Sequence, residues 1–221
     1  MSGSPPKRDS AVATGRGDDG TTGLLFGGPR ISKDDARTDA YGTIDEAVAA
    51  LGLARAEIKL KEQYGALPAP LAGVGELVLR FQRELFVVGA ELATNPDAWD
   101  RLEDGRTRVS SAMVAGIDEA LAELEGSIEM PREFVVPGET RLSAALELAR
   151  TVLRRAERRS VALGREGLIP GPHLLPYLNR LADLLWVLAR AAEAGEAKSS
   201  TPAQTRRRSR GSAVAPREDQ R

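Results

Sequence analysis

The stretch ETRLSAALELARTVLRRAERRSVALG, residues 139–164, shows most clearly which fold the chain adopts. Strand-like alternation of apolar and polar residues hardly appears in it, or elsewhere between the two ends of the chain. Instead, apolar side chains recur at steps of three and four residues, which is the spacing of one face of an α-helix. We therefore predict one long helix here, with a core face made of Leu142, Leu146, Ala149, Leu153 and Ala156.

The same period predicts four more helices. The first of them stops at Gly65, a residue that commonly ends a helix, and the second stops before Asn95 and Pro96. Five amphipathic helices with mostly short connections predict an all-α protein, an up-and-down five-helix bundle. The four additional helices are expected over residues 34–63, 71–94, 106–125 and 173–193.

The composition narrows the chemistry that such a bundle can perform. With 221 residues, of which 42% are hydrophobic, the chain is long enough for one domain with a real core. The absence of cysteine excludes disulfides, thiol nucleophiles, cysteine-ligated zinc and iron–sulfur clusters. The single histidine, His173, cannot form a two-histidine metal site, and we assign it no catalytic role at the border of the last helix. Any chemistry must therefore use carboxylates, Lys and Arg, hydroxyls, backbone amides or a bound cofactor.

The two ends of the chain differ from the part between them. We predict a domain over residues 14–194, a disordered tail over residues 1–13 and a disordered basic tail over residues 195–221. The last segment has no Leu, Ile, Phe, Met or aromatic residue, so it cannot bury enough surface to offset its ordering entropy. We therefore expect its deletion to leave assembly and activity intact. The lack of a secretory or membrane-spanning apolar stretch predicts a cytoplasmic protein with no membrane partner.

A run of glycine and threonine, TGRGDDGTTG at residues 14–23, precedes the first helix. Such a run can expose consecutive backbone N–H groups to an anion, because glycine allows close approach and positive φ. It lacks the GKS or GKT ending of a Walker loop. Spacing alone therefore leaves a flexible lead-in as the other interpretation.

The helix quoted first also carries a ladder of arginines beside its core face. Arginine suits bidentate binding of phosphate, and Glu157, close to Arg154 on the helix, could orient that arginine or face a metal ion. The alternative is a solvent-exposed face held by salt bridges, but such a face normally alternates its charges, whereas arginine here far exceeds acid. The ladder consists of Arg150, Arg154, Arg155, Arg158, Arg159 and Arg165.

Two further segments hold aromatic side chains of interest. In EFVVPGE, residues 133–139, Phe134 belongs to a short β-prone piece and could simply anchor the loop to the core. In PYLNRLADLLWVLARAA, residues 176–192, we expect a second helix face opposite Leu181 that a subunit or a ligand covers. That second face consists of Asn179, Asp183, Trp186 and Arg190.

Six blocks follow one another along the chain: TGRGDDGTTG, Lys33-Asp34-Asp35, AYGTIDE from Ala40, FVVPG from Phe134, ARTVLRRAERR from Ala149 and YLNRLAD from Tyr177. In this order and spacing they resemble the PduO-type ATP:cob(I)alamin adenosyltransferases over residues 14–192. The resemblance implies an all-helical homotrimer with active sites between subunits. There ATP binds to the Gly-rich run of one chain and to the arginine helix of its neighbour.

The resemblance also assigns roles to individual positions. Asp45 and Arg150 match a pair that bridges subunits in the family. Phe134 matches the aromatic residue that lies against the lower face of the corrin ring, and Asp183 and Trp186 lie in the region lining that pocket. Asp45, Phe134, Arg150 and Arg154 form the implied catalytic set, and no residue is assigned to a metal. The implied ATP contacts are Thr14, Gly15, Arg16, Gly17, Asp18, Asp19, Gly20, Lys33, Arg154, Arg155, Glu157, Arg158 and Asn179.

The implied reaction suits a chain without cysteine. Cob(I)alamin is itself a strong nucleophile, so the protein must only hold C5′ of ATP against cobalt and stabilise the leaving triphosphate. The implied partners are ATP with Mg²⁺, cob(I)alamin or cob(II)alamin, a flavin reductant and an adenosylcobalamin-dependent mutase. The chain departs from the family at Gly15 and Arg16, which replace more usual residues, and at Glu147, where many members have His.

Two other classes of function stay open on the residues alone. One is a non-catalytic helical scaffold or regulator whose arginine helix binds an acidic partner, which predicts no ATP affinity. The other is a nucleic-acid binder that uses the RRRSR run at residues 206–210, which predicts strong salt dependence. The net charge of −1 gives no general reason to expect nucleic acid or an anionic membrane as a partner.

Overall fold

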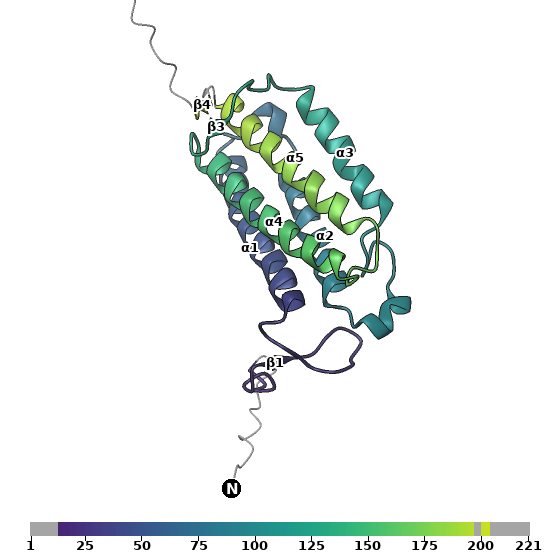
Figure 1. The fold of residues 1–221 in the computed structure, drawn as a ribbon. Coiled ribbons are helices and arrows are strands. Elements are labelled where there is room, and N and C mark those ends of the chain that lie inside the picture. The colour runs from purple at the N-terminus through teal and green to yellow at the C-terminus, as the bar shows by residue number, and fades with distance from the viewer. Residues whose placement is uncertain (1–12, 197–199, 204–221) are drawn as a thin grey trace, which may run out of the picture.

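Helices make up most of the described structure, a computed structural model in which residues 13–196 and 200–203 are described. All five predicted helices are present, and successive helices run in opposite directions (Figure 1). The predicted helical bundle is therefore confirmed. Among the helices described, none combines the length and apolarity that a bilayer span requires. The elements are β1 (Thr21–Thr22), β2 (Ile31–Ser32), α1 (Ala36–Gln63), η1 (Ala69–Leu71), α2 (Val74–Ala93), η2 (Pro96–Arg101), α3 (Ser111–Glu125), β3 (Val135–Val136), α4 (Arg141–Arg165), α5 (Leu174–Gly195) and β4 (Thr201–Pro202).

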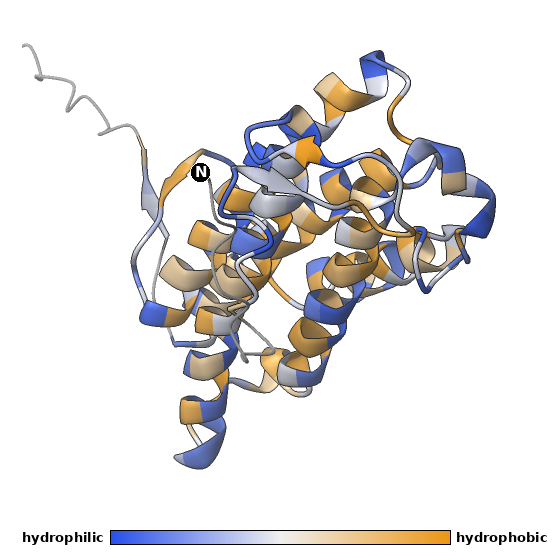
Figure 2. Ribbon diagram, turned by 90° about the horizontal axis from the view of Figure 1, so that it is seen from below, coloured by the Kyte–Doolittle hydropathy of each residue, from blue (hydrophilic) through white to orange (hydrophobic). Residues whose placement is uncertain are grey.

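The helices bury one another's apolar faces. Helix α1 packs against α2 and α4, and helix α5 packs against α3 and α4. Hydrophobic residues gather on the faces where helices meet, and polar residues gather outside (Figure 2). Each fully buried leucine, such as Leu146 or Leu153 on α4, contributes roughly 1.5–3 kcal/mol of burial free energy. The predicted core face of α4 is buried throughout.

Side chains cap the start of helices α4 and α3. The Thr140 hydroxyl accepts a hydrogen bond from the Ser143 N–H (2.9 Å), and the Ser143 hydroxyl accepts one from the Thr140 N–H (3.2 Å). This reciprocal capping box fixes the residue at which the chain leaves β3 and enters α4. The Ser110 hydroxyl likewise caps α3 by accepting from the Met113 N–H.

Helix α3 begins later than the predicted range of 106–125. Gly105 has a φ of +75°, and the Glu103 N–H donates to the Thr107 hydroxyl (2.8 Å), so a tight turn precedes the helix. Val109 belongs to the predicted apolar pattern and is buried, but it lies before the Ser110 cap. Apolar periodicity continues through this turn because a buried side chain does not require a helical backbone.

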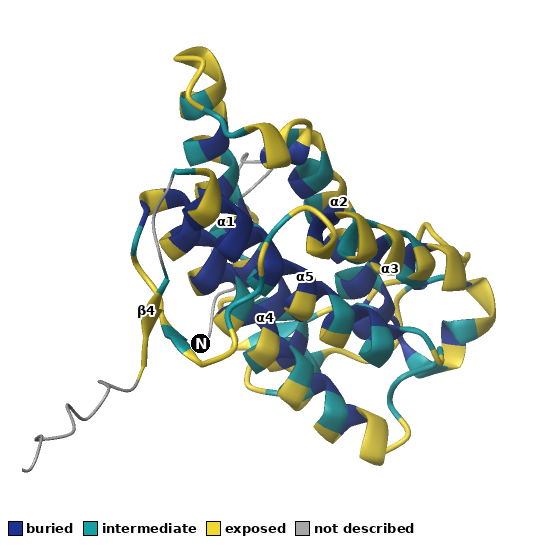
Figure 3. Cartoon of the chain, turned by 90° about the horizontal axis from the view of Figure 1, so that it is seen from above, coloured by how far each residue is buried: buried dark blue, intermediate teal, exposed yellow. Residues whose placement is uncertain are grey.

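Helix α5 is enclosed more widely than its periodicity predicts. We expected Trp186 and Arg190 on a face left for a subunit or a ligand to cover, but Arg190 is only 2% exposed and Trp186 packs against the core. The chain's own helices α3 and α4 cover α5 on two sides. Buried residues accordingly gather where α1, α4 and α5 meet (Figure 3). Asn179 and Asp183 are exposed, as predicted.

The predicted disorder of residues 195–221 is wrong for the part of that segment that the structure describes. Helix α5 continues to Gly195, and residues 200–203 lie beside the β3 loop, where β4 pairs antiparallel with β3. The pairing rests on backbone hydrogen bonds, which need no large apolar side chain. Composition, which measures only what side chains can bury, therefore missed this strand, and the expectation that the whole segment can be deleted without effect no longer extends to residues 200–203. Residues 1–12, 197–199 and 204–221 lie outside the described residues, as does the RRRSR run.

A buried carboxylate ties two loops to the bundle. Glu91 on α2 is buried, and its two oxygens accept hydrogen bonds from the N–H groups of Val109 (2.7 Å) and Gly171 (3.1 Å). Burial raises the pKa of Glu91 despite these two bonds. The loop before α3 and the loop before α5 are thereby held against the end of α2 from which η2 departs.

Candidate active site

The arginines of α4 point to two different sides of the helix. Arg155 pairs with Glu46, and Arg159 pairs with Asp39 (2.6 Å) and also donates to Thr43, all of them on α1. These two arginines therefore bind the helix that packs beside them. Arg155 was implied as an ATP contact, and within this chain it lies on the α1 side, away from Arg154.

The other side of α4 faces α5 and forms a first cavity. Arg154 and Glu157 lie 3.8 Å apart, the Asn179 side chain donates to Glu157 (3.3 Å), and Arg158 donates to the Arg154 carbonyl (3.1 Å). Four of the implied ATP contacts are thus brought together. The cavity beside them has a volume of 320 Å³ and is lined by Arg154, Glu157, Arg158, Val161, Ala162 and Arg165.

A second cavity of 560 Å³ lies between α3, the β3 loop, α4 and α5. It brings together all three residues implied on the corrinoid side, Phe134, Asp183 and Trp186, which are far apart in the sequence. The remaining wall is made of apolar side chains and of charged side chains from α3 and α4 in similar shares. The other lining residues are Leu121, Glu125, Val135, Pro137, Glu147, Arg150, Arg154, Ala182 and Val187.

Phe134 lines this cavity without being packed. Its side chain is 89% exposed, so the interpretation of Phe134 as a core anchor is wrong. The reason is its position at the start of β3, where the backbone rather than the ring holds the loop. At the edge of the cavity the exposed ring offers apolar surface to a ligand bound there.

Arg154 belongs to both cavities. Its side chain is 45% exposed, and its only ion-pair partner among the described residues is Glu157. The guanidinium therefore keeps most of its donors available between the two cavities. A group bound in one cavity and a group bound in the other would meet at this residue.

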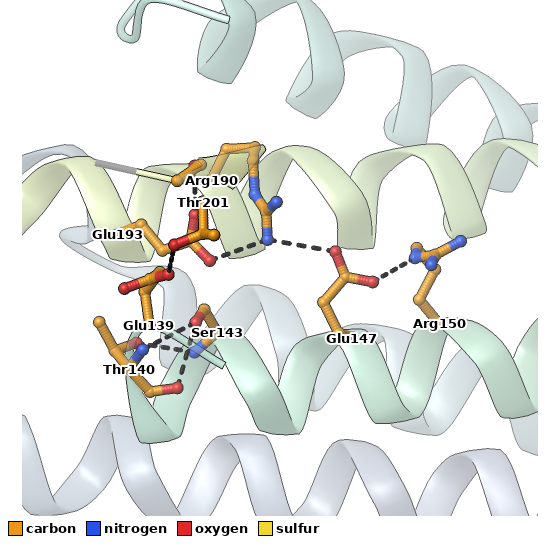
Figure 4. Close-up of polar contacts among 9 residues, drawn as sticks. Glu139, Thr140, Ser143, Glu147, Arg150, Arg190, Glu193 and Thr201 are labelled. Atoms are coloured by element: carbon orange, nitrogen blue, oxygen red, sulfur yellow. Dashed lines mark hydrogen bonds and ion pairs between the residues drawn. The ribbon is translucent and has the colours of Figure 1, made fainter. Parts of the chain in front are cut away.

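A buried ionic network backs the second cavity (Figure 4). Glu147 on α4 is only 3% exposed and accepts from Arg150 (2.6 Å) with one oxygen and from Arg190 (3.2 Å) with the other. Arg190 in turn donates to Glu193 (2.9 Å) one turn further along α5. Two cations therefore face Glu147, whose role the sequence alone left open. Arg190 was not assigned to the site beforehand because helical spacing placed it on an outer face.

The Gly-rich run folds into a loop that Arg30 and Lys33 hold. Arg30 donates to the Thr21 hydroxyl (2.7 Å) and to the carbonyls of Arg16 (2.8 Å) and Thr21 (2.9 Å). Lys33 donates to the Gly17 carbonyl (2.7 Å) and lies so close that a Cβ on Gly17 would meet its Nζ at 2.8 Å. The sequence did not indicate a role for Arg30, because an arginine in a loop belongs to no helical or repeated pattern.

The loop keeps a donor free for an anion. Gly15 and Gly20 have φ values of +72° and +79°, as glycine permits. Among the described residues, the N–H group of Gly17 has no hydrogen-bond partner. Hydrogen bonds from the Thr21 hydroxyl and N–H hold the pKa of Asp19 below its ordinary value, so this carboxylate braces the loop.

The implied site residues fall into two groups within one chain. Within the part of the chain that the structure describes, no hydrogen bond or ion pair joins residues 14–33 to α4. Asp45 on α1 is exposed, and it has no ion-pair partner among the described residues, so it does not contact Arg150 in the same chain. The Gly-rich loop and Asp45 are thus separate from the two cavities.

A family model described as cobalamin adenosyltransferase matches residues 12–192, which include both cavities and the Gly-rich loop. The chain belongs to the cobalamin adenosyltransferase family. Relatives of this adenosyltransferase-family chain include a corrinoid adenosyltransferase from Citrobacter freundii, 37% identical over 182 residues that cover 82% of this chain and 94% of that protein. A cobalamin adenosyltransferase from Cupriavidus metallidurans is 39% identical over 184 residues, covering 83% and 88%.

Solved structures of the same family share the fold. A PduO-type ATP:corrinoid adenosyltransferase variant from Lactobacillus reuteri, complexed with ATP, superimposes with a TM-score of 0.73 at 26% identity and covers 87% of this chain and all of that one. Another variant of the Lactobacillus reuteri enzyme, complexed with cobalamin and ATP, gives a TM-score of 0.72 at 27% identity over 87% of this chain and 98% of that one. The bundle described above is therefore the fold of cobalamin adenosyltransferases.

Proposed function

We propose that this chain transfers the 5′-deoxyadenosyl group of ATP to cob(I)alamin, giving adenosylcobalamin and triphosphate. The observation that carries the proposal is that Arg154 lines both the cavity with the implied ATP contacts and the cavity with the implied corrinoid contacts. The electron pair of Co(I) forms the bond to C5′, and the pair of the breaking C5′–O bond leaves with triphosphate. A cation at the junction stabilises that leaving charge.

The nucleotide half of the site uses charge and backbone donors. Arg154, Arg158 and the free N–H group of the Gly-rich loop bind the triphosphate of the Mg²⁺–ATP substrate, and Asn179 orients Glu157 beside them. We infer that these parts meet between subunits of a homotrimer. The separation of the loop from α4 within one chain supports this arrangement.

The corrinoid half of the site uses shape and apolarity. Phe134 lies under the corrin ring and excludes a lower axial ligand from cobalt, while Trp186 and Asp183 line the same pocket. An axial ligand donates electron density to cobalt and opposes its reduction to Co(I), so its exclusion favours reduction by a biological reductant. In this proposal the reaction occurs in the cytoplasm, a flavin reductant supplies the electron, and a mutase uses the product.

One assay tests the reaction. Purified full-length chain is incubated anaerobically with Mg²⁺, ATP and chemically reduced cob(I)alamin, and the absorption spectrum is followed. We expect conversion to the spectrum of adenosylcobalamin and formation of one triphosphate per turnover. A chain that leaves both substrates unchanged would contradict the proposal and return the molecule to the scaffold interpretation.

Pairing across subunits gives a separate prediction. If Asp45 binds Arg150 of a neighbouring subunit, Asp45→Asn weakens assembly or turnover, and adding Arg150→Gln recovers part of the loss, because the second change removes the unpaired partner. We expect a coupling of about 1 kcal/mol between the two sites. Arg150 also pairs with Glu147, so Arg150→Gln carries a loss of its own, which the comparison of single and double variants subtracts. Light scattering and turnover measure it. Glu46→Gln, whose partner Arg155 lies in the same chain, is the control, and strictly additive losses would argue against the pair.

A further inference from the structure

Residues 200–203 lie against the loop that carries Phe134. The Ala203 N–H donates to the Phe134 carbonyl (2.7 Å), and β4 pairs with β3 through Pro202 opposite Val135 and Thr201 opposite Val136. The Thr201 hydroxyl also binds Glu139 (Figure 4). These residues lie beyond the 12–192 that the family model matches, so the family gives them no role.

The strand is anchored on α5 through a buried carboxylate. The Ser200 hydroxyl donates to Glu193, which is only 1% exposed. Glu193 accepts with its other oxygen from Arg190, and the same nitrogen of Arg190 donates to Glu147. A continuous set of hydrogen bonds therefore leads from β4 to the wall of the second cavity.

Arg190 stands at the junction of this network. Its guanidinium carbon lies 5.6 Å from the centre of the Trp186 ring, a cation–π distance, and Trp186 lines the cavity. The other charged groups in direct contact with it are Glu147 and Glu193, and Arg150 lies on the far side of Glu147. A single nitrogen, Nη2, bridges the two buried carboxylates, while Nε and Nη1 have no hydrogen-bond partner among the described residues.

The Phe134 ring needs such support from the backbone. The residue is 89% exposed, so the ring has almost no packing against the rest of the chain. The position of the ring therefore depends on where β4 holds the backbone carbonyl of Phe134. We propose that Arg190 is a positioning residue for the corrinoid site, which acts through Glu193, Ser200 and the β4 strand to hold Phe134 at the cavity. The inference rests on the proposed function, because it names what fixes the residue that meets the corrinoid.

The connection can be broken without touching the core. Ala203→Pro removes the single N–H that binds the Phe134 carbonyl, at an exposed position that already follows a proline. Ala203→Val keeps this donor and is the matched control. We expect Ala203→Pro to raise the KM for cob(II)alamin about fivefold in the assay with a flavin reductant, the worth of one hydrogen bond, with ATP affinity and melting temperature unchanged. An unchanged KM, or an equal change in Ala203→Val, would overturn the inference.

Arg190 itself is tested in combination, because its removal leaves two buried carboxylates unpaired. Arg190→Lys keeps the charge and should also raise the KM for cob(II)alamin in the assay with a flavin reductant. If Arg190 acts through the strand, Arg190→Lys adds little in the Ala203→Pro background, whereas independent effects would multiply and refute the link. A wild-type chain that makes no adenosylcobalamin would instead refute the proposed function, so the two failures are distinguishable.

Discussion

Replacing Arg154 by alanine should abolish productive ATP binding and leave the bundle folded. The side chain is half-exposed, and its one ion pair, to Glu157 at 3.8 Å, is too long and too exposed to stabilise the fold appreciably. In a shielded cleft, however, each charge-assisted bond from this guanidinium to phosphate is worth about 1.5–3 kcal/mol. With two such bonds lost, the affinity for ATP should fall by roughly 100-fold or more. Calorimetric titration with Mg²⁺–ATP measures the loss.

A second arginine of the same helix gives the control. Arg141 pairs with Glu57 on α1 and lines neither cavity, so Arg141→Ala removes the same charge from α4 without removing a site residue. ATP affinity should stay near the wild-type value in this variant. Equal losses in Arg141→Ala and Arg154→Ala would mean that only the overall charge of α4 matters. Unchanged affinity in Arg154→Ala would return the arginines to the interpretation of a solvent-exposed salt-bridged face.

Replacing Phe134 by alanine should separate reduction from adenosyl transfer. Starting from cob(II)alamin and a flavin reductant, turnover should fall roughly 100-fold, within the 1–5 kcal/mol that conformational and desolvation effects on a bound substrate supply. Starting from chemically reduced cob(I)alamin, the variant should keep much more of its activity, because the step that needs an excluded axial ligand has already occurred. Both assays are made on one preparation.

Stability distinguishes this role from packing. Truncating a buried phenylalanine lowers the free energy of unfolding by about 3–5 kcal/mol, whereas truncating an exposed one changes it by no more than about 0.5 kcal/mol. Since Phe134 is exposed, the melting temperature and the ATP affinity of the Phe134→Ala variant should match those of the wild type. Val136→Ala, on the same strand but outside the cavity, is the control for the loop. Equal losses in the two turnover assays, or a melting temperature lowered by many degrees, would contradict the role assigned to Phe134.

Local pattern was sufficient for the helices and for the order of the functional blocks. Leu142 to Ala156 on α4 show why: their period depends only on the geometry of a helix with one buried face, which any neighbour can cover. The residue types of the Gly-rich run likewise indicate a tight loop, because Gly15 and Gly20 have no Cβ and can adopt the positive φ found there. Membership in the family therefore needed no coordinates.

Three features depended on the tertiary structure, because each arises from contacts between distant segments of the chain. Arg190 is a buried cation because α3 and α4 both cover α5, and Arg154 lines two cavities because the β3 loop and α5 approach α4. Residues 200–203 form a strand because β3 offers them a backbone edge. A single helix period reports one buried face and says nothing of a second neighbour. Contacts between segments distant in the chain arise only when packing brings these segments together. The sequence therefore determined the helical bundle and the types of side chain available for chemistry, and the fold decided which of these side chains face one another.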